Sequence, residues 1–397
     1  MHASEHRSGR FVIQPSAYRA FIPAPLPPVP PLDLEGELRG LLSSADQAIG
    51  RLDGVVRFVP DPDIFVAMYV RREAVLSSQI EGTQSTLEDL LEVELEPDSS
   101  DGDVGEIVNY VAAMNYGLNR LQELPLSLRL IREIHGELLR DGRGSRATPG
   151  EFRMTQNWIG PRGAGLKQAT YVPPPVPDMK TALGDFETFL HSDDRLPLLV
   201  VAGLAHAQFE TIHPFLDGNG RVGRLLITFL LCRGGALRAP LLYLSYYLKL
   251  HRSEYYDRLM AVRIGGDWEG WLRFFLRGVA ETAAGANATA ERVVELRESA
   301  RARVMEDAGA NGLRLLSLLF QRPLVNVNRV KDELEVTFPT ASRLVNRFED
   351  LGLLRELTGR SRSRLYRFEP YFSLFDDPQA PEPEEGPIEM TESNGGR

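Results

Sequence analysis

The chain has 397 residues, of which 43% are hydrophobic and 25% are charged, a composition typical of a globular protein with two or more domains. Its single cysteine, Cys232, excludes a disulfide framework, no apolar run approaches the roughly 18 residues of a membrane span, and the first residues lack the apolar stretch of a signal peptide. The formal net charge is −10, to which residues 376–397 contribute seven acids and one arginine, so we expect a cytoplasmic protein with no membrane partner and an acidic, disordered tail at 373–397.

In chain order, residues 1–32 come first as a leader whose end is rich in proline, a residue that lacks the amide hydrogen a helix interior needs. Beyond it, apolar residues recur at helical spacing. The predicted helices span residues 33–52, 63–81, 104–123, 127–140, 178–190, 197–212, 219–234, 240–249, 252–264 and 268–300. Residues 150–176 break this rhythm, because two extended arms flank a glycine-bearing tip at 160–165 and predict a β-hairpin. The pattern therefore indicates a mainly α protein.

The C-terminal part of the sequence predicts a separate unit at residues 305–372, joined to the rest by a helical linker at 284–304. Within it, helical spacing of apolar residues is followed by an extended return of the chain. These segments are 311–321, 327–334 and 338–351 for the helices and 365–368 for the strand. Three helices followed by a two-stranded wing resemble a winged helix-turn-helix domain.

Basic residues outnumber acidic residues by seven to four between positions 340 and 370. The basic residues are Arg343, Arg347, Arg355, Arg360, Arg362, Arg364 and Arg367. Three of them alternate with serine at the expected tip of the wing, which fits contact with a phosphate backbone. A solvated hairpin of a protein-interaction domain has the same pattern, so duplex DNA and a protein remain alternative partners of this unit.

Residues 213–224 read His-Pro-Phe-Leu-Asp-Gly-Asn-Gly-Arg-Val-Gly-Arg and carry the most informative pattern in the chain. The glycine-rich turn at 218–220 leads into an apolar helical run. A helix N-terminus presents unpaired amides and the positive end of a dipole, which together attract anions. Arg221 and Arg224 are three residues apart, so both can reach one polyphosphate. The turn therefore predicts a phosphate site.

Two further groups in this stretch add chemistry to the phosphate site. Asp217 can hold Mg²⁺ against the phosphates, and His213 can accept a proton from a hydroxyl. The chain has neither a Gly-x-x-x-x-Gly-Lys-Ser/Thr loop nor a Gly-x-Gly-x-x-Gly turn of a βαβ unit. Instead, the stretch resembles, position by position, the His-Pro-Phe-x-Asp/Glu-Gly-Asn-Gly-Arg-x-x-Arg signature of the Fic family of protein adenylyltransferases.

The resemblance implies that His213 is the general base that deprotonates a Tyr, Thr or Ser hydroxyl of a target protein. The resulting oxygen attacks the α-phosphate of ATP, AMP becomes attached to the target, and pyrophosphate leaves. Glycine at position 220, where phosphate-transferring relatives have lysine, implies AMP transfer. The matched positions for binding ATP are Asp217, Gly218, Asn219, Gly220, Arg221 and Arg224, with Asp217 as the ligand of Mg²⁺ or Mn²⁺.

The family lines its adenine pocket with the helix that follows the motif helix. This makes Tyr256 and Arg263 candidates for contact with adenine. His206 lies seven residues before His213 on the same helical pattern. Because no third metal ligand stands at a suitable spacing, we interpret His206 as a packing residue.

A second motif lies upstream, where residues 77–82 read Ser-Ser-Gln-Ile-Glu-Gly. Ser77 and Glu81 are four residues apart and share a helix face, and Gly82 is a suitable helix stop. The segment resembles the Ser/Thr-x-x-x-Glu-Gly/Asn inhibitory motif of the same family. The resemblance implies that Glu81 pairs with Arg224, takes the place of the γ-phosphate and makes ATP bind unproductively.

The sequence therefore predicts a Fic-type helical bundle with a β-hairpin flap and a C-terminal winged helix-turn-helix domain. Its expected divisions are a leader at 1–32, a region with the inhibitory helix at 33–124, a catalytic domain at 125–283, the linker, the winged unit and the tail. The predicted function is AMP transfer to a target protein and to the chain itself. A DNA-binding regulator that senses ATP and a hydrolase that removes AMP with Glu81 remain alternatives, and the oligomeric state, a homodimer included, stays open.

Overall fold

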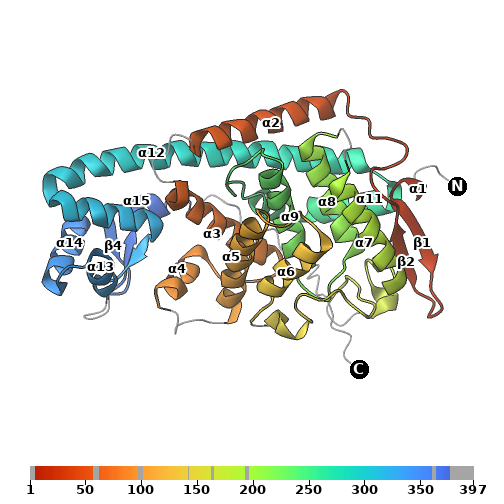
Figure 1. Ribbon diagram of the computed structural model, residues 1–397, viewed down its shortest axis with the longest axis horizontal. Coiled ribbons are helices and arrows are strands. Elements are labelled where there is room, and N and C mark those ends of the chain that lie inside the picture. Colours follow the sequence, from red (N-terminus) through yellow and green to blue (C-terminus); the bar gives the residue numbers. More distant parts are fainter. Residues whose placement is uncertain are drawn as a thin grey trace.

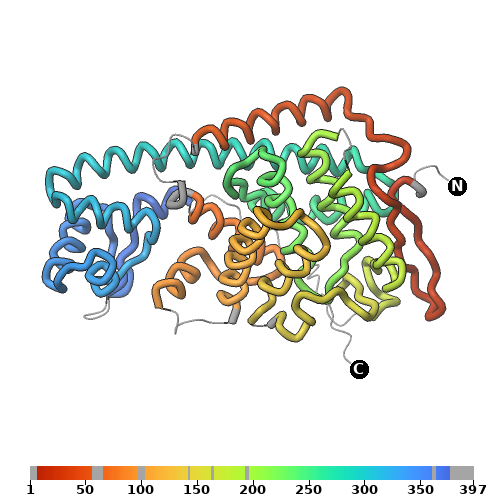
Figure 2. Tube along the Cα trace, in the orientation of Figure 1, coloured from red at the N-terminus to blue at the C-terminus, as the bar shows by residue number. Residues whose placement is uncertain are grey.

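The computed structural model describes residues 5–56, 62–96, 102–141, 143–161, 165–192, 196–359 and 364–375. This part of the chain is mainly helical, with two small antiparallel sheets. A large helical bundle and a smaller unit lie at opposite ends of an elongated molecule (Figures 1 and 2). Among the described residues, no helix combines the length and apolarity needed to cross a membrane. The predicted tail lies outside the described residues, apart from 373–375.

The bundle is centred on α8 (Leu198–Ile212) and α9 (Asn219–Arg233), which pack against each other. Almost every residue of α8 is buried, because its sequence is apolar on all sides, as expected for a central helix. The surrounding helices are α3 (Pro62–Ile80), α5 (Gly102–Arg120), α6 (Leu128–Leu138), α7 (Val176–His191), α10 (Ser245–Leu250) and α11 (Arg252–Gly265). Most bounds agree with the predicted helices to within three residues, but α10 begins five residues later than expected.

The longest element is α12 (Trp268–Gln321), which runs the length of the molecule and joins the bundle to the smaller unit (Figure 1). α2 (Glu37–Val56) packs along it. The sequence predicted a helix that ended at residue 300 and a separate helix at 311–321. The structure has a single run, interrupted only at Gly309, whose φ of 61° and ψ of −152° are not helical. The predicted linker, residues 284–304, is therefore the middle of one long helix that has a non-helical residue at Gly309.

The smaller unit has the winged helix-turn-helix arrangement that the sequence predicted. Its elements after α12 are β3 (Leu324–Val325), α13 (Val327–Leu334), α14 (Phe338–Asp350), β4 (Leu354–Glu356), β5 (Tyr366–Phe368) and α15 (Glu369–Phe372). β5 lies between β3 and β4, and both pairs are antiparallel. The two strands of the wing are joined through residues 360–363, so Arg360 and Arg362 lie outside the described residues.

Outside the winged unit, two regions of the chain add elements to the predicted fold. In the leader, α1 (Glu5–Ser8) is followed by β1 (Gly9–Ile13) and β2 (Arg19–Pro23), which form an antiparallel hairpin. Between the inhibitory motif and α5, the chain forms α4 (Leu87–Leu95). Its start is a capping box, in which Thr86 and Asp89 bond to each other's backbone amides.

The predicted flap is less regular than a hairpin. Ile159 and Tyr171 form a single antiparallel bridge, and a 3₁₀ turn, η3 (Leu166–Gln168), stands between the two arms. The leader hairpin covers the second arm, because Phe21 donates its amide to the carbonyl of Val172 at 2.9 Å. Phe21, Ile159 and Tyr171 form a small apolar cluster of their own. The flap is thus held between the bundle and the leader.

Candidate active site

The turn between α8 and α9 is shaped by two residues in the left-handed region of backbone space. His213 ends α8 with φ 49° and ψ 60°, an uncommon conformation for a residue other than glycine. Gly218 precedes α9 with φ 77°, where the absence of a Cβ removes the usual strain. Together they reverse the chain within the motif and place its histidine and its second helix beside the same space.

Asn219 fixes this turn from inside. Its Oδ1 accepts the amide of Phe215 at 2.9 Å, and its Nδ2 donates to the carbonyl of the same residue at 3.0 Å. The side chain is fully buried. The sequence placed Asn219 in an anion cradle through its backbone amide, and its side chain holds the loop to which that amide belongs.

Two residues of the flap region hold the turn from the other side. Arg153 donates from Nε to the carbonyl of His213 at 3.0 Å, and Asn157 donates from Nδ2 to the same carbonyl at 3.2 Å. Both side chains are buried. Neither residue was predicted from the sequence, because nothing in the spacing of residues 150–176 connects them with a motif some 60 positions later.

His135 of α6 braces the next part of the turn. Its ring stacks on Phe215 with centroids 3.7 Å apart, its Nδ1 accepts the amide of Gly150 at 2.9 Å, and its Nε2 lies 3.0 Å from the carbonyl of Asp217. These partners require a neutral ring protonated on Nε2. Burial lowers the pKa of His135 to about 4, which keeps the ring in that state.

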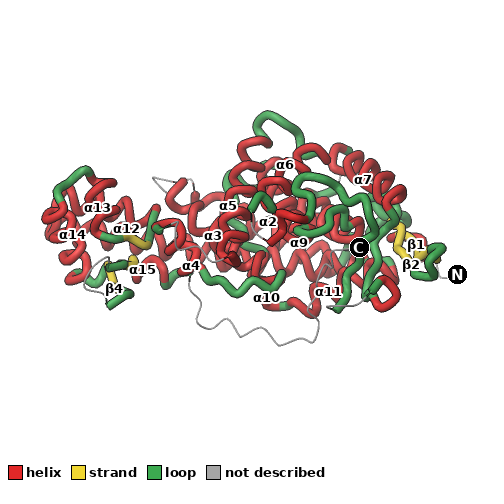
Figure 3. Tube along the Cα trace, turned by 90° about the horizontal axis from the view of Figure 1, so that it is seen from below, coloured by secondary structure: helices red, strands yellow, loops and turns green. Residues whose placement is uncertain are grey.

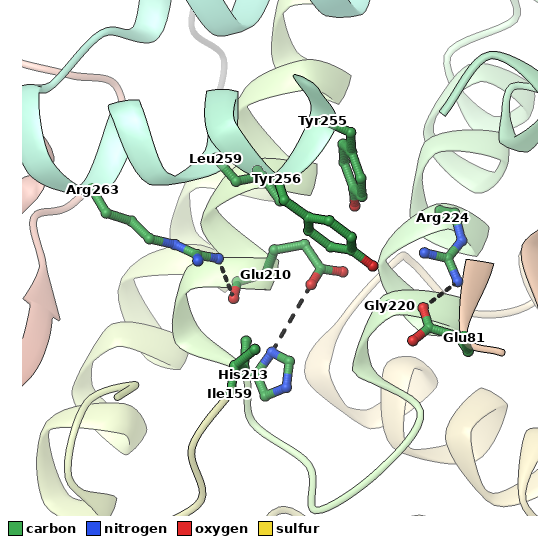
Figure 4. A pocket seen from close by; sticks show the side chains of 10 residues that line it. All are labelled: Glu81, Ile159, Glu210, His213, Gly220, Arg224, Tyr255, Tyr256, Leu259 and Arg263. Atoms are coloured by element: carbon green, nitrogen blue, oxygen red, sulfur yellow. Dashed lines mark hydrogen bonds and ion pairs between the residues drawn. The ribbon is translucent and has the colours of Figure 1, made fainter. Parts of the chain in front are cut away.

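A pocket opens at the end of the turn, between the motif, the flap and α11 (Figure 4). It brings the predicted base and two of the predicted phosphate-binding residues, Gly220 and Arg224, together with the predicted adenine-binding residues. Its lining residues are Glu81, Ile159, Glu210, His213, Gly220, Arg224, Tyr255, Tyr256, Leu259 and Arg263. Residues from α8, α9 and α11 and from the end of α3 therefore share one space, although the chain separates them widely.

His213 is buried in this pocket and held as a neutral base. Burial is the largest influence and lowers the pKa of His213 to about 4, against the opposing influence of the Glu210 carboxylate. Glu210 Oε2 lies 3.9 Å from Nδ1 of His213 (Figure 4). The pKa of Glu210 is itself raised by burial. The sequence analysis did not select Glu210, although it stands three residues before His213 on a helix whose face it shares.

Arg224 is a buried cation of the pocket, and residues of the upstream motif bind it. Its Nε donates to Oγ of Ser77 at 2.8 Å, and its Nη2 donates to the Ser77 carbonyl at 3.0 Å and to Oε1 of Glu81 at 2.6 Å. A Cβ at Gly220 would lie 2.2 Å from the same Glu81 oxygen. Glycine at this position therefore makes room for an oxygen atom next to the guanidinium.

Arg221 points to a different set of partners. It donates from Nη1 to Oε2 of Glu106 at 3.1 Å and from Nη2 to Oδ1 of Asp217 at 3.3 Å. Its side chain is 4% exposed and does not line the pocket. The sequence predicted that both arginines reach one polyphosphate, but the structure brings only Arg224 to the pocket. Arg221 positions the carboxylate of Asp217.

Asp217 offers one carboxylate for a metal ion. Its Oδ1 accepts the amide of Gly218 at 2.6 Å as well as the Arg221 contact, and the side chain is one-third exposed. The described residues contain no cluster of three or more side chains of the usual metal ligands. A single carboxylate fits Mg²⁺ that takes its remaining ligands from phosphate oxygens and water.

The remaining predicted residues lie on α11 and α8. Arg263 donates to the Glu210 carbonyl at 3.0 Å and stacks over the ring of Tyr171 at 3.9 Å, so it braces one wall of the pocket. Tyr256 forms another wall. His206 lies between the carbonyl of Gly223 and the hydroxyl of Tyr255, at 2.9 and 2.8 Å, which agrees with the packing role expected for it.

Comparison with known proteins identifies three stretches of the chain. Residues 39–119 match the N-terminal region of the Fic/DOC family, residues 125–231 match the Fic/DOC family itself, and residues 313–366 match a helix-turn-helix DNA-binding domain. The chain is 34% identical over 209 residues to a protein adenylyltransferase Fic of Drosophila grimshawi. The matched stretch covers 51% of this chain and 39% of the relative. It is 31% identical over 256 residues to the protein of the same name from Drosophila melanogaster. That stretch covers 62% of this chain and 46% of the relative.

Solved structures share the fold at low sequence identity. A Fic family protein from Desulfovibrio desulfuricans is 20% identical, with a TM-score of 0.53 over 85% of this chain and 97% of that one. A Fic-domain signalling protein from Bacteroides thetaiotaomicron is 17% identical, with a TM-score of 0.50 over 66% and 97% of the two chains. This chain spans less than half the length of the curated relatives it matches. The two matched regions, residues 39–119 and 125–231, show that this part of the chain belongs to the Fic/DOC family.

Proposed function

We propose that the chain is a protein adenylyltransferase that transfers AMP from ATP to a Tyr, Thr or Ser hydroxyl of a target protein and of itself. The observation that carries this proposal is the pocket in which a neutral, buried His213 and the guanidinium of Arg224 face one space. The names of the curated relatives support the same activity. A base and a phosphate ligand on one rigid turn suit a reaction in which positioning and charge neutralisation dominate.

In the proposed reaction, His213 accepts the proton of the attacking hydroxyl. The hydroxyl oxygen forms a bond to the α-phosphorus of ATP, and the bond from that phosphorus to the bridging oxygen of the β-phosphate breaks. Pyrophosphate leaves with the bonding electrons, and AMP stays on the target. Arg224 binds the outer phosphates, and the amide of Gly220, in the first turn of α9, supports them. Asp217 would hold Mg²⁺, which would supply neutralisation of charge on the phosphates.

The same proposal includes autoinhibition by Glu81. The Arg224 side chain is 2% exposed and binds the Glu81 carboxylate, so an incoming γ-phosphate must displace that carboxylate. Phosphate and carboxylate compete for a guanidinium because both accept its bidentate hydrogen bonds. The contact between Glu81 and Arg224 supports this part of the proposal. If Glu81 instead orients a water, the same contact serves the removal of AMP.

A second proposed activity belongs to the winged unit, which we propose binds duplex DNA. Its match to a DNA-binding family supports this. α14 occupies the position of a recognition helix and exposes Arg343 and Asn346 on one face, three residues apart. Arginine pairs with guanine and asparagine with adenine in the major groove. A protein partner of this unit remains the alternative.

A labelling experiment tests the main proposal. The purified chain and a Glu81→Gly variant are incubated with Mg²⁺ and with ATP labelled on the α- or the γ-phosphate. Label from α-phosphate alone, found by mass spectrometry as AMP on a hydroxyl side chain, supports the proposal. Label from the γ-phosphate indicates a kinase. ATP binding without any transfer indicates a nucleotide sensor, and release of AMP from a modified protein indicates the hydrolase.

A further inference from the structure

α4 lies between the winged unit and α3, which we call the inhibitory helix because Glu81 follows its end. α4 contacts both (Figures 1 and 3). α3 ends at Ile80, Glu81 follows it, and α4 begins only six residues later at Leu87. The carboxylate that binds Arg224 is therefore attached through a short connection to a helix that the winged unit also contacts. Sequence patterns in neither motif indicate this arrangement.

Both faces of the winged sheet are covered. The apolar residues of its strands are divided between these two faces. Along β5 and the residue before it, Tyr366 and Phe368 face the main core, whereas Leu365 belongs to a cluster with Leu91 of α4. This alternation is that of a strand buried on both sides. The helices of the winged unit cover the first face, and α4 covers the second. Leu324 and Phe372 complete the apolar contact with α4.

Two ion pairs flank the apolar contact, each between a mostly buried arginine and a partly exposed glutamate. Arg367 of β5 donates from Nη1 to Glu88 of α4 at 3.0 Å, and the arginine side chain is 11% exposed. Arg71 of α3 donates from Nη2 to Glu94 of α4 at 2.7 Å and is 13% exposed. α4 is thus tied to the winged sheet on one side and to the inhibitory helix on the other.

A direct contact joins the winged unit to the inhibitory helix as well. Phe375, just after α15, packs edge-to-face on Tyr69 of α3 with ring centroids 5.3 Å apart. Both rings are buried. The inhibitory helix therefore meets the winged unit at two places, once through α4 and once at its own side.

The connection between Glu81 and α4 is itself held tightly. Thr83 is buried, donates its amide to the carbonyl of Ser78 at 3.2 Å and its hydroxyl to Glu106 at 3.5 Å. Gln79 donates to the carbonyl of Ser85 at 2.9 Å. Because these bonds leave the connection little slack, a displacement of α4 shifts the residues that place Glu81 against Arg224.

We propose that the winged unit, docked on α4, holds the inhibitory segment, residues 77–86, in place. Whether this unit is docked or undocked then sets the rate of AMP transfer. This rests on the proposed function of the pocket. When α4 is undocked, the winged unit stays joined to the bundle by α12, and the non-helical Gly309 gives that arm a joint. A ligand that favours the undocked position raises the rate by linkage. The exposed face of α14 lies on the helical side of the sheet, away from α4, and is free to receive duplex DNA.

The test compares charge changes on α4 in the full chain, with self-modification from α-labelled ATP as the readout. Leu91→Arg places a charge in the apolar contact and is expected to raise the rate by at least about fivefold, the lower end of allosteric coupling. Glu88→Arg removes one ion pair and is expected to act in the same direction, by about twofold. Glu298→Arg makes the same charge change at an exposed residue of α12 and is expected to leave the rate unchanged.

The same variants in the Glu81→Gly background separate the outcomes. If docking acts through Glu81, Leu91→Arg has no further effect there, and the retained activity shows that the pocket is folded. Hydrogen exchange is expected to show faster exchange of residues 77–86 in Leu91→Arg. An unchanged rate in Leu91→Arg, although α4 amides exchange faster, overturns the inference. An absence of AMP transfer in Glu81→Gly itself overturns the proposed function instead.

Discussion

The α8–α9 turn and the segment that joins α3 to α4 meet at one guanidinium, yet they are built differently. The turn is contiguous in sequence, and its histidine, its asparagine and its arginines are nearly all buried. The inhibitory contact joins residues 143 positions apart, and it binds the buried Arg224 to a Glu81 side chain that is 29% exposed. A buried turn is fixed by many partners, whereas the partly exposed Glu81 side chain can lose its contact with the guanidinium when the connection to α4 shifts. We therefore expect catalysis to be intolerant of substitution and inhibition to be adjustable.

The largest effect is expected for the base. His213→Ala, made in the Glu81→Gly background, should lower AMP transfer by at least about a hundredfold, because general-base catalysis contributes about 10² to 10⁴. Nucleotide affinity should change little, since the imidazole has no role in binding phosphate. Single-turnover labelling and equilibrium ATP binding measure the two quantities. His191→Ala, which changes a histidine outside the pocket, serves as the control, and transfer within tenfold of the background rate would make the base assignment wrong.

Arg224→Ala tests the residue that the two regions share. The substitution should remove most of the activity in the parent chain and in the Glu81→Gly variant, because the guanidinium binds the phosphates as well as the Glu81 carboxylate. The double variant should thus match Arg224→Ala alone, in transfer rate and in ATP affinity. Arg221→Ala is an informative comparison, because Arg221 contacts Glu106 and Asp217 and does not line the pocket. A larger loss of ATP affinity in Arg221→Ala than in Arg224→Ala would reverse the roles drawn from these contacts.

Glu81→Gly is expected to have a smaller effect of the opposite sign. It frees Arg224 for the γ-phosphate, and transfer should rise by at least about tenfold, about 1.4 kcal/mol in the effective barrier. Stability should change little, because removing a partly exposed ion pair seldom costs much. Initial rates of self-modification and a urea unfolding curve check both parts. Glu35→Gly, in the exposed loop before α2, is a control for the loss of an acidic side chain, and equal rates in Glu81→Gly and the parent would refute autoinhibition.

Much of this architecture could be predicted because it is local in sequence. The motif at 213–224 is continuous, so its turn and its helix follow from adjacent residues. The partners that the sequence did not indicate come from distant segments. Glu106 reaches Arg221 from 115 positions away, and His135 reaches Asp217 from 82 positions away. Their side chains have no spacing relation to the motif, and only the packing of α5 and α6 against α9 brings them to it.

Short elements on the periphery were missed for a related reason. α4 has nine residues, too few for a strong periodic signal, and its apolar residues divide between the winged sheet and the main core. The leader hairpin has ordinary strand residues, but its pairing depends on the flap that it covers. In both cases the element is stabilised by a neighbour that lies far away in sequence.

The smallest effect is expected for Glu210, which lies beside the base without belonging to either motif. Its carboxylate, 3.9 Å from Nδ1, favours protonation of His213, whereas burial, Arg263 and Arg153 oppose it, and Glu81 acts in the same direction as Glu210. Because the pKa of His213 is about 4, the base should stay free at pH 5.5, and the transfer rate should show no loss near the ordinary histidine pKa of about 6.5.

Glu210→Gln removes the charge that stabilises the protonated ring. The pKa of His213 should fall further, so any acid limb of the rate profile should move to lower pH, and the rate at pH 7.5 should drop about threefold because the imidazolium formed in the reaction loses its neighbour. Rates of the Glu81→Gly variant with and without Glu210→Gln, measured from pH 5 to 8, give both quantities. A structural role alone would lower the rate equally at every pH. A rate that halves near pH 6.5 in the parent would show that burial does not keep His213 neutral, and the contrast between a fixed catalytic turn and an adjustable inhibitory segment would then have to include the protonation state of the base.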